Sequence, residues 1–200
     1  MAKRGLVGWL ILGLLCVMGS GNSATQRARS APPRDTTEEK PEIIIQAYTD
    51  GLSGIRTANP DVKLSVGRDS ALGGEPVLFV DYPAPGADPA ARDVVCDAVQ
   101  RDWTSGRAIS FRIKPAHAVK LSVSFVDRNR VAYTTWTELK AGVWQPVRIS
   151  FDEMRPNPYF QPADAQTGAS IDVSDVTGIA FAPHDQTSGR LAISKIIVLK

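Results

Sequence analysis

The chain has 200 residues, enough for one domain with a substantial core and too few for two once the ends are discounted. Its 23 Lys and Arg residues nearly balance its 21 Asp and Glu residues, which excludes the basic excess on which nucleic-acid binding relies. Two cysteines and two histidines supply little for a disulfide framework or a zinc site.

The first 24 residues have the three parts of a secretory signal peptide. Lys3 and Arg4 precede an uncharged apolar run over residues 5–17, and small residues follow up to Ala24. At about 1.5 Å of rise per residue, the apolar run is too short for the ~30 Å hydrocarbon layer of a membrane. We therefore expect residues 1–24 to be a cleaved signal and the mature protein to be secreted or periplasmic, with no membrane contact after cleavage.

Residues 25–41 are predicted to form a flexible linker. This segment is rich in Arg, Ser, Pro and Glu, and it has no aliphatic or aromatic side chain larger than that of alanine. It cannot bury enough apolar surface to offset the entropy lost on ordering. The folded domain is therefore expected to occupy residues 42–200.

The domain is predicted to be all-β, because apolar residues recur at every second position through the central stretch 102–151. Ile109, Phe111 and Ile113 illustrate this alternation, which is typical of antiparallel strands with one buried face. The expected strands lie near residues 43–45, 64–66, 76–82, 93–99, 109–113, 121–125, 131–133, 147–151, 178–182 and 191–199. About nine or ten short strands separated by turns predict an antiparallel β-sandwich of jelly-roll type.

Two connections in the second half of the chain stand out. Residues 127–130, Asp-Arg-Asn-Arg, are predicted to form a hairpin turn, because Asx side chains at such sites bond their own backbone. Residues 152–170 form the longest irregular stretch and contain three prolines. Long loops of this kind are often functional. Tyr159 and Phe160 in this loop are candidates to line the mouth of a binding groove, with packing of the loop as the alternative.

The order of the elements resembles the galactose-binding-like jelly rolls. The resemblance is carried by Asp102-Trp103, the alternating strands, the Gly142-Val143-Trp144 step and the apolar segments after Asp172. Within that group the chain is most similar to family 11 carbohydrate-binding modules and to the related domain of complex I intermediate-associated proteins. The resemblance covers roughly residues 42–200. It implies a noncatalytic domain that binds glycans on the concave face of one sheet, in many members with a structural calcium.

Trp136 is the predicted platform for a sugar ring. Sugar recognition uses flat aromatic faces together with planar polar groups that bond the hydroxyls. If Val131 and Tyr133 point inward, strand alternation turns Trp136 outward. The alternative is that Trp136 covers a loop or a sheet edge. Tyr133 is expected in the core, with its hydroxyl near the rim of the site.

Several polar residues are expected to share the outward face with Trp136. These residues are Arg112, Lys114, Lys120 and Ser122, and His184 is placed within reach of them. Arg112, Lys120 and Asp127 are the predicted polar partners of the glycan. Together with Arg130, the cations would select an acidic glycan, or they would form an ordinary solvated face paired with carboxylates.

Other distinctive residues are assigned structural roles. Trp103 and Trp144 are expected to pack in the core and under a turn, and Cys96 is expected to be a buried thiol. No Asp-x-Asp-x-Asp-Gly loop is present. A structural calcium would therefore need a site assembled from carboxylates on distant strands, and that option stays open.

No catalytic signature appears in the sequence. It lacks the Gly-x-Ser-x-Gly, Gly-rich phosphate-loop and His-Glu-x-x-His motifs. A glycosidase would have to use a pair such as Asp127 and Asp152. We therefore predict a protein that is not an enzyme: an exported carbohydrate-binding module. The alternative is an interaction or assembly module of the complex I intermediate-associated type, which would bind an envelope protein through the same sheet or the loop at Tyr159 and Phe160.

Overall fold

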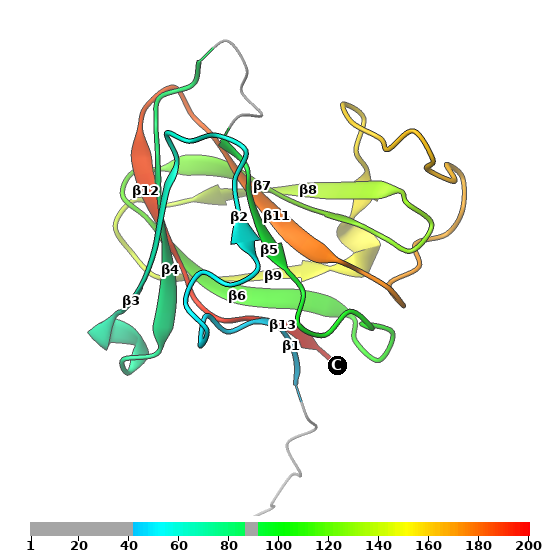
Figure 1. The fold of residues 1–200 in the computed structure, drawn as a ribbon, viewed down its shortest axis with the longest axis horizontal. Coiled ribbons are helices and arrows are strands. Elements are labelled where there is room, and N and C mark those ends of the chain that lie inside the picture. Colours follow the sequence, from blue (N-terminus) through cyan, green and yellow to red (C-terminus); the bar gives the residue numbers. More distant parts are fainter. Residues whose placement is uncertain (1–41, 87–91) are drawn as a thin grey trace, which may run out of the picture. The chain divides into compact units, whose positions relative to one another are not determined.

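Two antiparallel sheets make up the part of the chain that the computed structural model describes, residues 42–86 and 92–200 (Figure 1). The signal peptide and the linker predicted over residues 1–41 lie outside these residues. Within them, no helix is long and apolar enough to cross a membrane. The prediction of an all-β fold is confirmed.

The first sheet, sheet A, has seven strands. Its strands are β1 (Ile43–Gln46), β3 (Lys63–Arg68), β4 (Pro76–Tyr82), β6 (Ala108–Pro115), β9 (Gln145–Ser150), β12 (Gly189–Ile193) and β13 (Ile196–Leu199). They follow the order β1, β13, β6, β12, β4, β3, and β9 pairs with the other side of β6. β12 and β13 pair with successive halves of β6, and Ser194 fills the step between them by bonding the backbone of Arg112 in both directions. Strand β6 is therefore central in sheet A.

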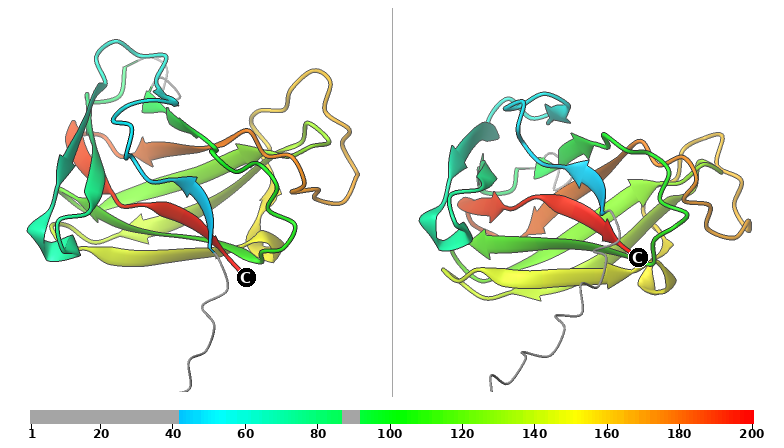
Figure 2. Two further views of the ribbon diagram at one scale, coloured as in Figure 1. Left: turned by 60° about the horizontal axis from the view of Figure 1, so that its bottom comes forward. Right: turned by 90° about the horizontal axis from the view of Figure 1, so that it is seen from below.

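The second sheet, sheet B, has six strands. They are β2 (Ile55–Arg56), β5 (Val94–Asp97), β7 (Val119–Val126), β8 (Ala132–Leu139), β10 (Arg155–Pro156) and β11 (Gly178–His184). The spatial order is β10, β8, β7, β11, β5, β2. The two sheets lie face to face as the layers of a sandwich (Figure 2). Sequential strands β6 and β7 therefore belong to different layers.

The core forms between the inner faces of the two sheets, as the alternation of apolar residues predicts. Ile109, Phe111 and Ile113 of β6 are buried, whereas Arg112 between them is exposed. Trp103 is completely buried and stacks on Phe151 with ring centroids 6.3 Å apart. The expected place of Trp103 in the core is therefore confirmed.

The hairpin turn between β7 and β8 is held by one carboxylate. Asp127 Oδ1 accepts the backbone N–H of Val131 at 2.9 Å, and Oδ2 accepts that of Asp172 at 2.9 Å. Arg130 takes the left-handed backbone conformation, with φ of 61°. The predicted turn at 127–130 is confirmed, and Asp127 also ties it to the loop that precedes β11.

Candidate functional site

Trp136 lies on the outer face of sheet B, with 40% of its surface exposed. Its register partner on β7 is Ser122, and the next outward residue of β7, Lys120, pairs with His184 of β11. The Lys120 ammonium lies 4.8 Å from the centre of the indole. The His184 ring lies 4.4 Å from it at an interplanar angle of 62°. We call Trp136, Lys120, Ser122 and His184 the Trp136 patch.

The members of the Trp136 patch hold one another in place. Ser122 is buried although its strand position faces outward, and its hydroxyl lies 3.0 Å from Nε2 of His184. Partial burial of His184, followed by the positive charges of Arg92 and Lys120, lowers the pKa of its imidazole. His184 is therefore neutral at neutral pH. The indole thus contacts a cation and a neutral ring, and 40% of its surface is exposed to solvent.

A groove of about 380 Å³ adjoins the Trp136 patch. Its lining residues are Pro85, Gly86, Arg92, His184, Asp185 and Gln186. His184 belongs to both the groove and the patch. The groove and the Trp136 patch therefore adjoin at His184.

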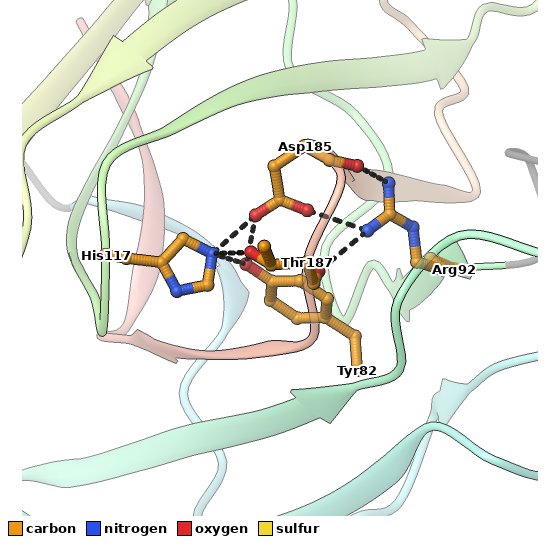
Figure 3. Close-up of polar contacts among 5 residues, drawn as sticks. All are labelled: Tyr82, Arg92, His117, Asp185 and Thr187. Atoms are coloured by element: carbon orange, nitrogen blue, oxygen red, sulfur yellow. Dashed lines mark hydrogen bonds and ion pairs between the residues drawn. The ribbon is translucent and has the colours of Figure 1, made fainter.

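A polar network fixes the loop that follows His184, and we call it the Asp185 network (Figure 3). Arg92 Nη1 donates to Asp185 Oδ1 at 2.8 Å, and Nη2 donates to the Asp185 carbonyl at 3.0 Å. Asp185 Oδ2 lies 2.6 Å from His117 Nε2 and accepts the Tyr82 hydroxyl at 3.0 Å. Thr187 Oγ1 completes the network at 3.0 Å from His117 Nε2.

The Asp185 network balances a buried charge. Arg92 is only 2% exposed. Burial would raise the pKa of Asp185, but the hydrogen bonds from His117, Arg92 and Tyr82 outweigh it and lower the pKa below its usual value. Burial and the bond to Asp185 raise the pKa of the Tyr82 hydroxyl. An ionised Asp185 therefore neutralises Arg92 and anchors the wall of the groove.

Arg112 does not share a face with Trp136, so this part of the sequence prediction is wrong. Arg112 and Lys114 lie on β6 of sheet A, whereas Lys120 and Trp136 lie on sheet B. Alternation tells which residues of one strand point outward, but it does not tell which layer the strand joins. Arg130 lies in the β7–β8 turn, where it pairs with Asp164 at 3.1 Å.

Asp127 is also wrong as a polar contact for a glycan. It is 2% exposed, and both its carboxylate oxygens accept backbone N–H groups. The same contacts remove Asp127 from any catalytic pair with Asp152. Tyr133 is buried in the core beside Phe125, at 6.0 Å between ring centroids, as the sequence predicts. Its hydroxyl contacts the Ala169 carbonyl of the long loop at 3.5 Å.

Tyr159 and Phe160 are the most exposed large aromatic residues of the long loop, at 85% and 60%. The loop leaves β10 beside β8, and Gln161 bonds both the N–H and the C=O of Ala132 at 2.9 Å. The base of the loop is thus fixed at the edge of sheet B, while its aromatic pair projects into solvent. The alternative that these two residues pack the loop receives no support from their exposure.

The remaining candidates have structural surroundings. Trp144 lies under the β3–β4 turn, donating to Asp69 at 3.2 Å. Cys96 is buried, and burial followed by the charge of Asp97 raises the pKa of its thiol to about 12. Among the described residues, no group of three or more His, Cys, Asp or Glu side chains could hold a metal ion.

Sequence reasoning missed most of the Asp185 network. Its five residues come from β4, from the segment before β5, from the β6–β7 turn and from the β11–β12 loop. No sequence motif links these positions, since they meet only when the two sheets pack. The polar run His184-Asp185-Gln186 at the end of an apolar strand was the one local signal.

Many solved structures are similar to this chain, among them the following three. A family 11 carbohydrate-binding module from Clostridium thermocellum, in complex with a β-1,3-1,4-mixed-linked tetrasaccharide, has a TM-score of 0.61 at 18% identity, covering 79% of this chain and 95% of that one. The family 30 carbohydrate-binding module of the cellulosomal cellulase Cel9D-Cel44B from the same organism has a TM-score of 0.53 at 16% identity, covering 80% and 96%. An exo-β-agarase has a TM-score of 0.56 at 14% identity, covering 80% of this chain and 26% of the enzyme.

No protein-family model matches the sequence, and no curated protein matches it. At the identities just given, the likeness to solved structures shows the fold. The chain has the jelly-roll architecture of family 11 and family 30 carbohydrate-binding modules, and the predicted fold class is confirmed.

Proposed function

We propose that this jelly-roll domain binds carbohydrate without catalysis, through the Trp136 patch on the outer face of sheet B. The observation that carries the proposal is an indole 40% exposed on the outer face of sheet B, in contact with Lys120 and His184. An exposed indole next to hydrogen-bonding groups suits the C–H face and the hydroxyls of a sugar. The shared fold with modules solved as carbohydrate binders supports the same assignment.

The adjoining groove sets the expected size of the ligand. A volume of about 380 Å³ lies near the lower end of the range for small-ligand sites, roughly 300–1,000 Å³. One sugar on Trp136 and a neighbouring unit in the groove would use both parts of the site. We therefore expect oligosaccharides to bind more tightly than monosaccharides.

Isothermal titration calorimetry tests the proposal, with a glycan array to choose the ligand. The β-1,3-1,4-mixed-linked tetrasaccharide is the first probe, because it is bound by a protein of the same fold. Replacing Trp136 by Ala should weaken binding at least tenfold, about 1.4 kcal/mol, while Trp136→Phe should retain part of the affinity. The matched control is Val143→Ala, which removes an exposed apolar side chain from the β8–β9 turn.

Two results would contradict this assignment. Glycan binding that is unchanged in Trp136→Ala would remove the site, and the absence of binding to every glycan on the array would remove the function. Incubation of the domain with a bound polysaccharide should release no new reducing ends. Measured release of reducing ends would contradict the noncatalytic part of the proposal.

Export belongs to the same proposal. Its support is the arrangement of residues 1–24, with a basic start, an apolar run and a small-residue end. N-terminal sequencing of the protein from the culture medium or the periplasm should find a chain that begins near Thr25. A chain that stays in the cytoplasm with its first 24 residues would contradict this prediction.

One observation favours a second candidate function, binding of an envelope protein. Tyr159 and Phe160 form an exposed aromatic pair on a loop whose base is fixed to sheet B. Exposed aromatic residues are enriched in protein interfaces. Capture of one defined envelope protein that is lost in a Tyr159→Ala, Phe160→Ala variant and unaffected by sugars would favour this alternative over carbohydrate binding.

A further inference from the structure

A second groove lies on the opposite side of the sandwich, on the outer face of sheet A. It has a volume of about 400 Å³. Residues that line it include Leu72, Glu75, Ser110, Arg112, Lys195 and Ile197. The groove is separated from the Trp136 patch by both layers of the domain, because its floor is the outer face of β6 and β13.

One wall of this groove is anchored firmly. The 3-10 turn η1 (Ser70–Leu72) follows Asp69, whose carboxylate accepts Lys114 Nζ at 2.7 Å and the Trp144 indole N–H at 3.2 Å. The Lys114 ammonium also lies 5.1 Å from the centre of the Trp144 ring. These contacts pin the β3–β4 turn over the outer face of sheet A. The groove is therefore bounded by a fixed wall and a regular floor.

Two arginines on this face have no anionic partner among the described residues. Ser110 faces Arg148 of β9 in the register, and Arg112 faces Pro146, so the two arginines are diagonal neighbours. Such neighbours on one sheet face lie roughly 7–8 Å apart. Both side chains are exposed, and within residues 42–86 and 92–200 none of the hydrogen bonds or ion pairs engages either guanidinium.

The other cations near this face have partners. Lys114 is paired with Asp69, Lys195 with Glu42 and Arg190 with Asp81. Lys63 and Arg68 of β3 have no ion pair, but each donates to a backbone carbonyl. Two adjacent unpaired cations repel one another, and an anion between them relieves the repulsion and accepts several hydrogen bonds. Guanidinium groups in particular bind carboxylate and sulfate oxygens in pairs.

We propose that the groove on sheet A, lined by Arg112 and flanked by Arg148 on the adjacent strand β9, is a second binding site that takes an acidic sugar unit of a polysaccharide. The arginines would bind the carboxylate or sulfate group. The Glu75 carboxylate and the Ser110 hydroxyl would bond sugar hydroxyls, and the side chains of Leu72 and Ile197 would contact the C–H surface. This site is independent of the Trp136 patch.

The test is calorimetric titration of the full chain with polygalacturonate, with a sulfated galactan and with a neutral galactan. We expect binding to an acidic polymer that weakens with rising salt, as electrostatic contacts do. The double variant Arg112→Gln, Arg148→Gln should lose at least tenfold in affinity. Comparison of the first two polymers shows whether a carboxylate or a sulfate is the preferred group, and either preference supports the site.

The matched control removes two positive charges elsewhere. Arg101 and Arg130 are already paired with Asp175 and Asp164, so Arg101→Gln, Arg130→Gln should change the affinity by less than twofold. Trp136→Ala should still bind the acidic polymer, and this binding should still weaken with rising salt. The proposal is overturned if neither acidic polymer binds or if Trp136→Ala abolishes the binding. It is also overturned if the control double variant loses as much affinity as the double variant of Arg112 and Arg148. Binding of neutral glycans at Trp136 is measured separately and does not depend on these outcomes.

Discussion

Trp103 and Trp136 have the same side chain but opposite environments, because one faces the core and the other faces solvent. Trp103 has no exposed surface, packs against Phe125 and Phe151, and donates its indole N–H to the Gln100 carbonyl at 2.7 Å. Trp136 lies at an outward strand position, so its large apolar surface is not buried in the core and does not contribute to core stability. The cost of an exposed indole is consistent with a surface that is covered by a ligand.

The contacts of Asp127 predict a role in stability and none in binding. In the wild-type protein, both carboxylate oxygens of Asp127 accept a backbone N–H group. Replacing Asp127 by Asn converts one of these acceptors into an NH₂ group, which faces a backbone N–H and cannot accept it. We expect the free energy of unfolding to fall by about 1–3 kcal/mol, with no change in glycan affinity. Urea unfolding measures the first quantity and calorimetry the second. Asp152 is exposed in the 3-10 turn η3 (Phe151–Glu153), which follows β9. Asp152→Asn should therefore change neither the free energy of unfolding nor the glycan affinity.

His184 should titrate below the usual midpoint of a histidine. Burial and the charges of Arg92 and Lys120 lower its pKa in the folded state, while the unfolded chain keeps a value of about 6.5. Between these two values the unfolded chain binds more protons, so stability falls as the pH falls below about 6.5. NMR titration of the His184 ring should give a midpoint below 6.5, and Lys120→Met should raise that midpoint. A midpoint at or above 6.5 would contradict the assignment.

At the scale of elements, the Asp185 network connects pieces of both sheets. Arg92 precedes β5, Tyr82 ends β4, and Asp185 follows β11, so their contacts join strand ends from the two layers. The network positions the loop that begins at His184. The proposed binding surface of sheet B therefore depends on contacts that lie outside that surface.

Removing Arg92 should destabilise the domain strongly, since it leaves a partly buried carboxylate without its main cation. Arg92→Met is expected to cost about 3–5 kcal/mol of unfolding free energy near pH 7. Because the folded pKa of Asp185 lies below its unfolded value of about 3.9, the contribution of ionised Asp185 is present above about pH 4 and is lost as the pH falls through the folded pKa. The difference between wild type and Arg92→Met should therefore narrow in acid.

The control for this prediction is an exposed ion pair. Arg101 pairs with Asp175 at 2.7 Å, and about half of each side chain is exposed. Such pairs contribute roughly 0–1 kcal/mol, so Arg101→Met should have a small effect at every pH. Equal losses in the two variants would show that burial of Arg92 adds nothing to the strength of its pair.

Strand β11 begins at a position where only glycine fits. A Cβ atom on Gly178 would lie 2.6 Å from the backbone carbonyl oxygen of Cys96 on the adjacent strand. Neither strand can move without breaking the pairing, so Gly178→Ala should cost about 1–3 kcal/mol. Thermal unfolding followed by circular dichroism measures the loss. Gly86→Ala is the matched control, because a Cβ atom at this position has no neighbour within 4 Å. The stability of this variant should equal that of the wild type.

At the scale of the whole domain, Cys96 reports on global unfolding. Its thiol is fully buried, and its pKa is raised to about 12 by burial and then by Asp97. Alkylation at pH 8 should therefore be slow in the folded state and proceed only through opening of sheet B. Mass spectrometry of the Cys96 peptide measures the rate against urea concentration. Rapid labelling of the native protein would show that sheet B opens locally around β5.

The fold was predictable because strand alternation is a local signal. The buried set Ile109, Phe111 and Ile113 and the exposed Trp136 both follow from a period of two. The error at Arg112 is of a different kind. β6 and β7 are joined by a short turn, and nothing local shows that the chain crosses from one sheet to the other there.

The candidate site was predictable in part for the same reason. Lys120 and Trp136 come from adjacent strands of one hairpin, so their proximity follows from the pairing of β7 with β8. His184 joins them only because β11 pairs with the other side of β7. Arg92 and Asp185 meet across 93 positions of sequence, and a contact of that range depends on the finished topology.

The crossing of the chain at the β6–β7 turn places Arg112 and Trp136 on surfaces that face away from each other. Packed sheets are about 10 Å apart, so one short oligosaccharide is unable to reach both surfaces. If both are occupied, two different polymer chains are tied together by a single domain. Mixtures of a neutral and an acidic polysaccharide should then turn viscous or cloudy when the protein is added, and either Trp136→Ala or the double arginine variant should abolish the effect.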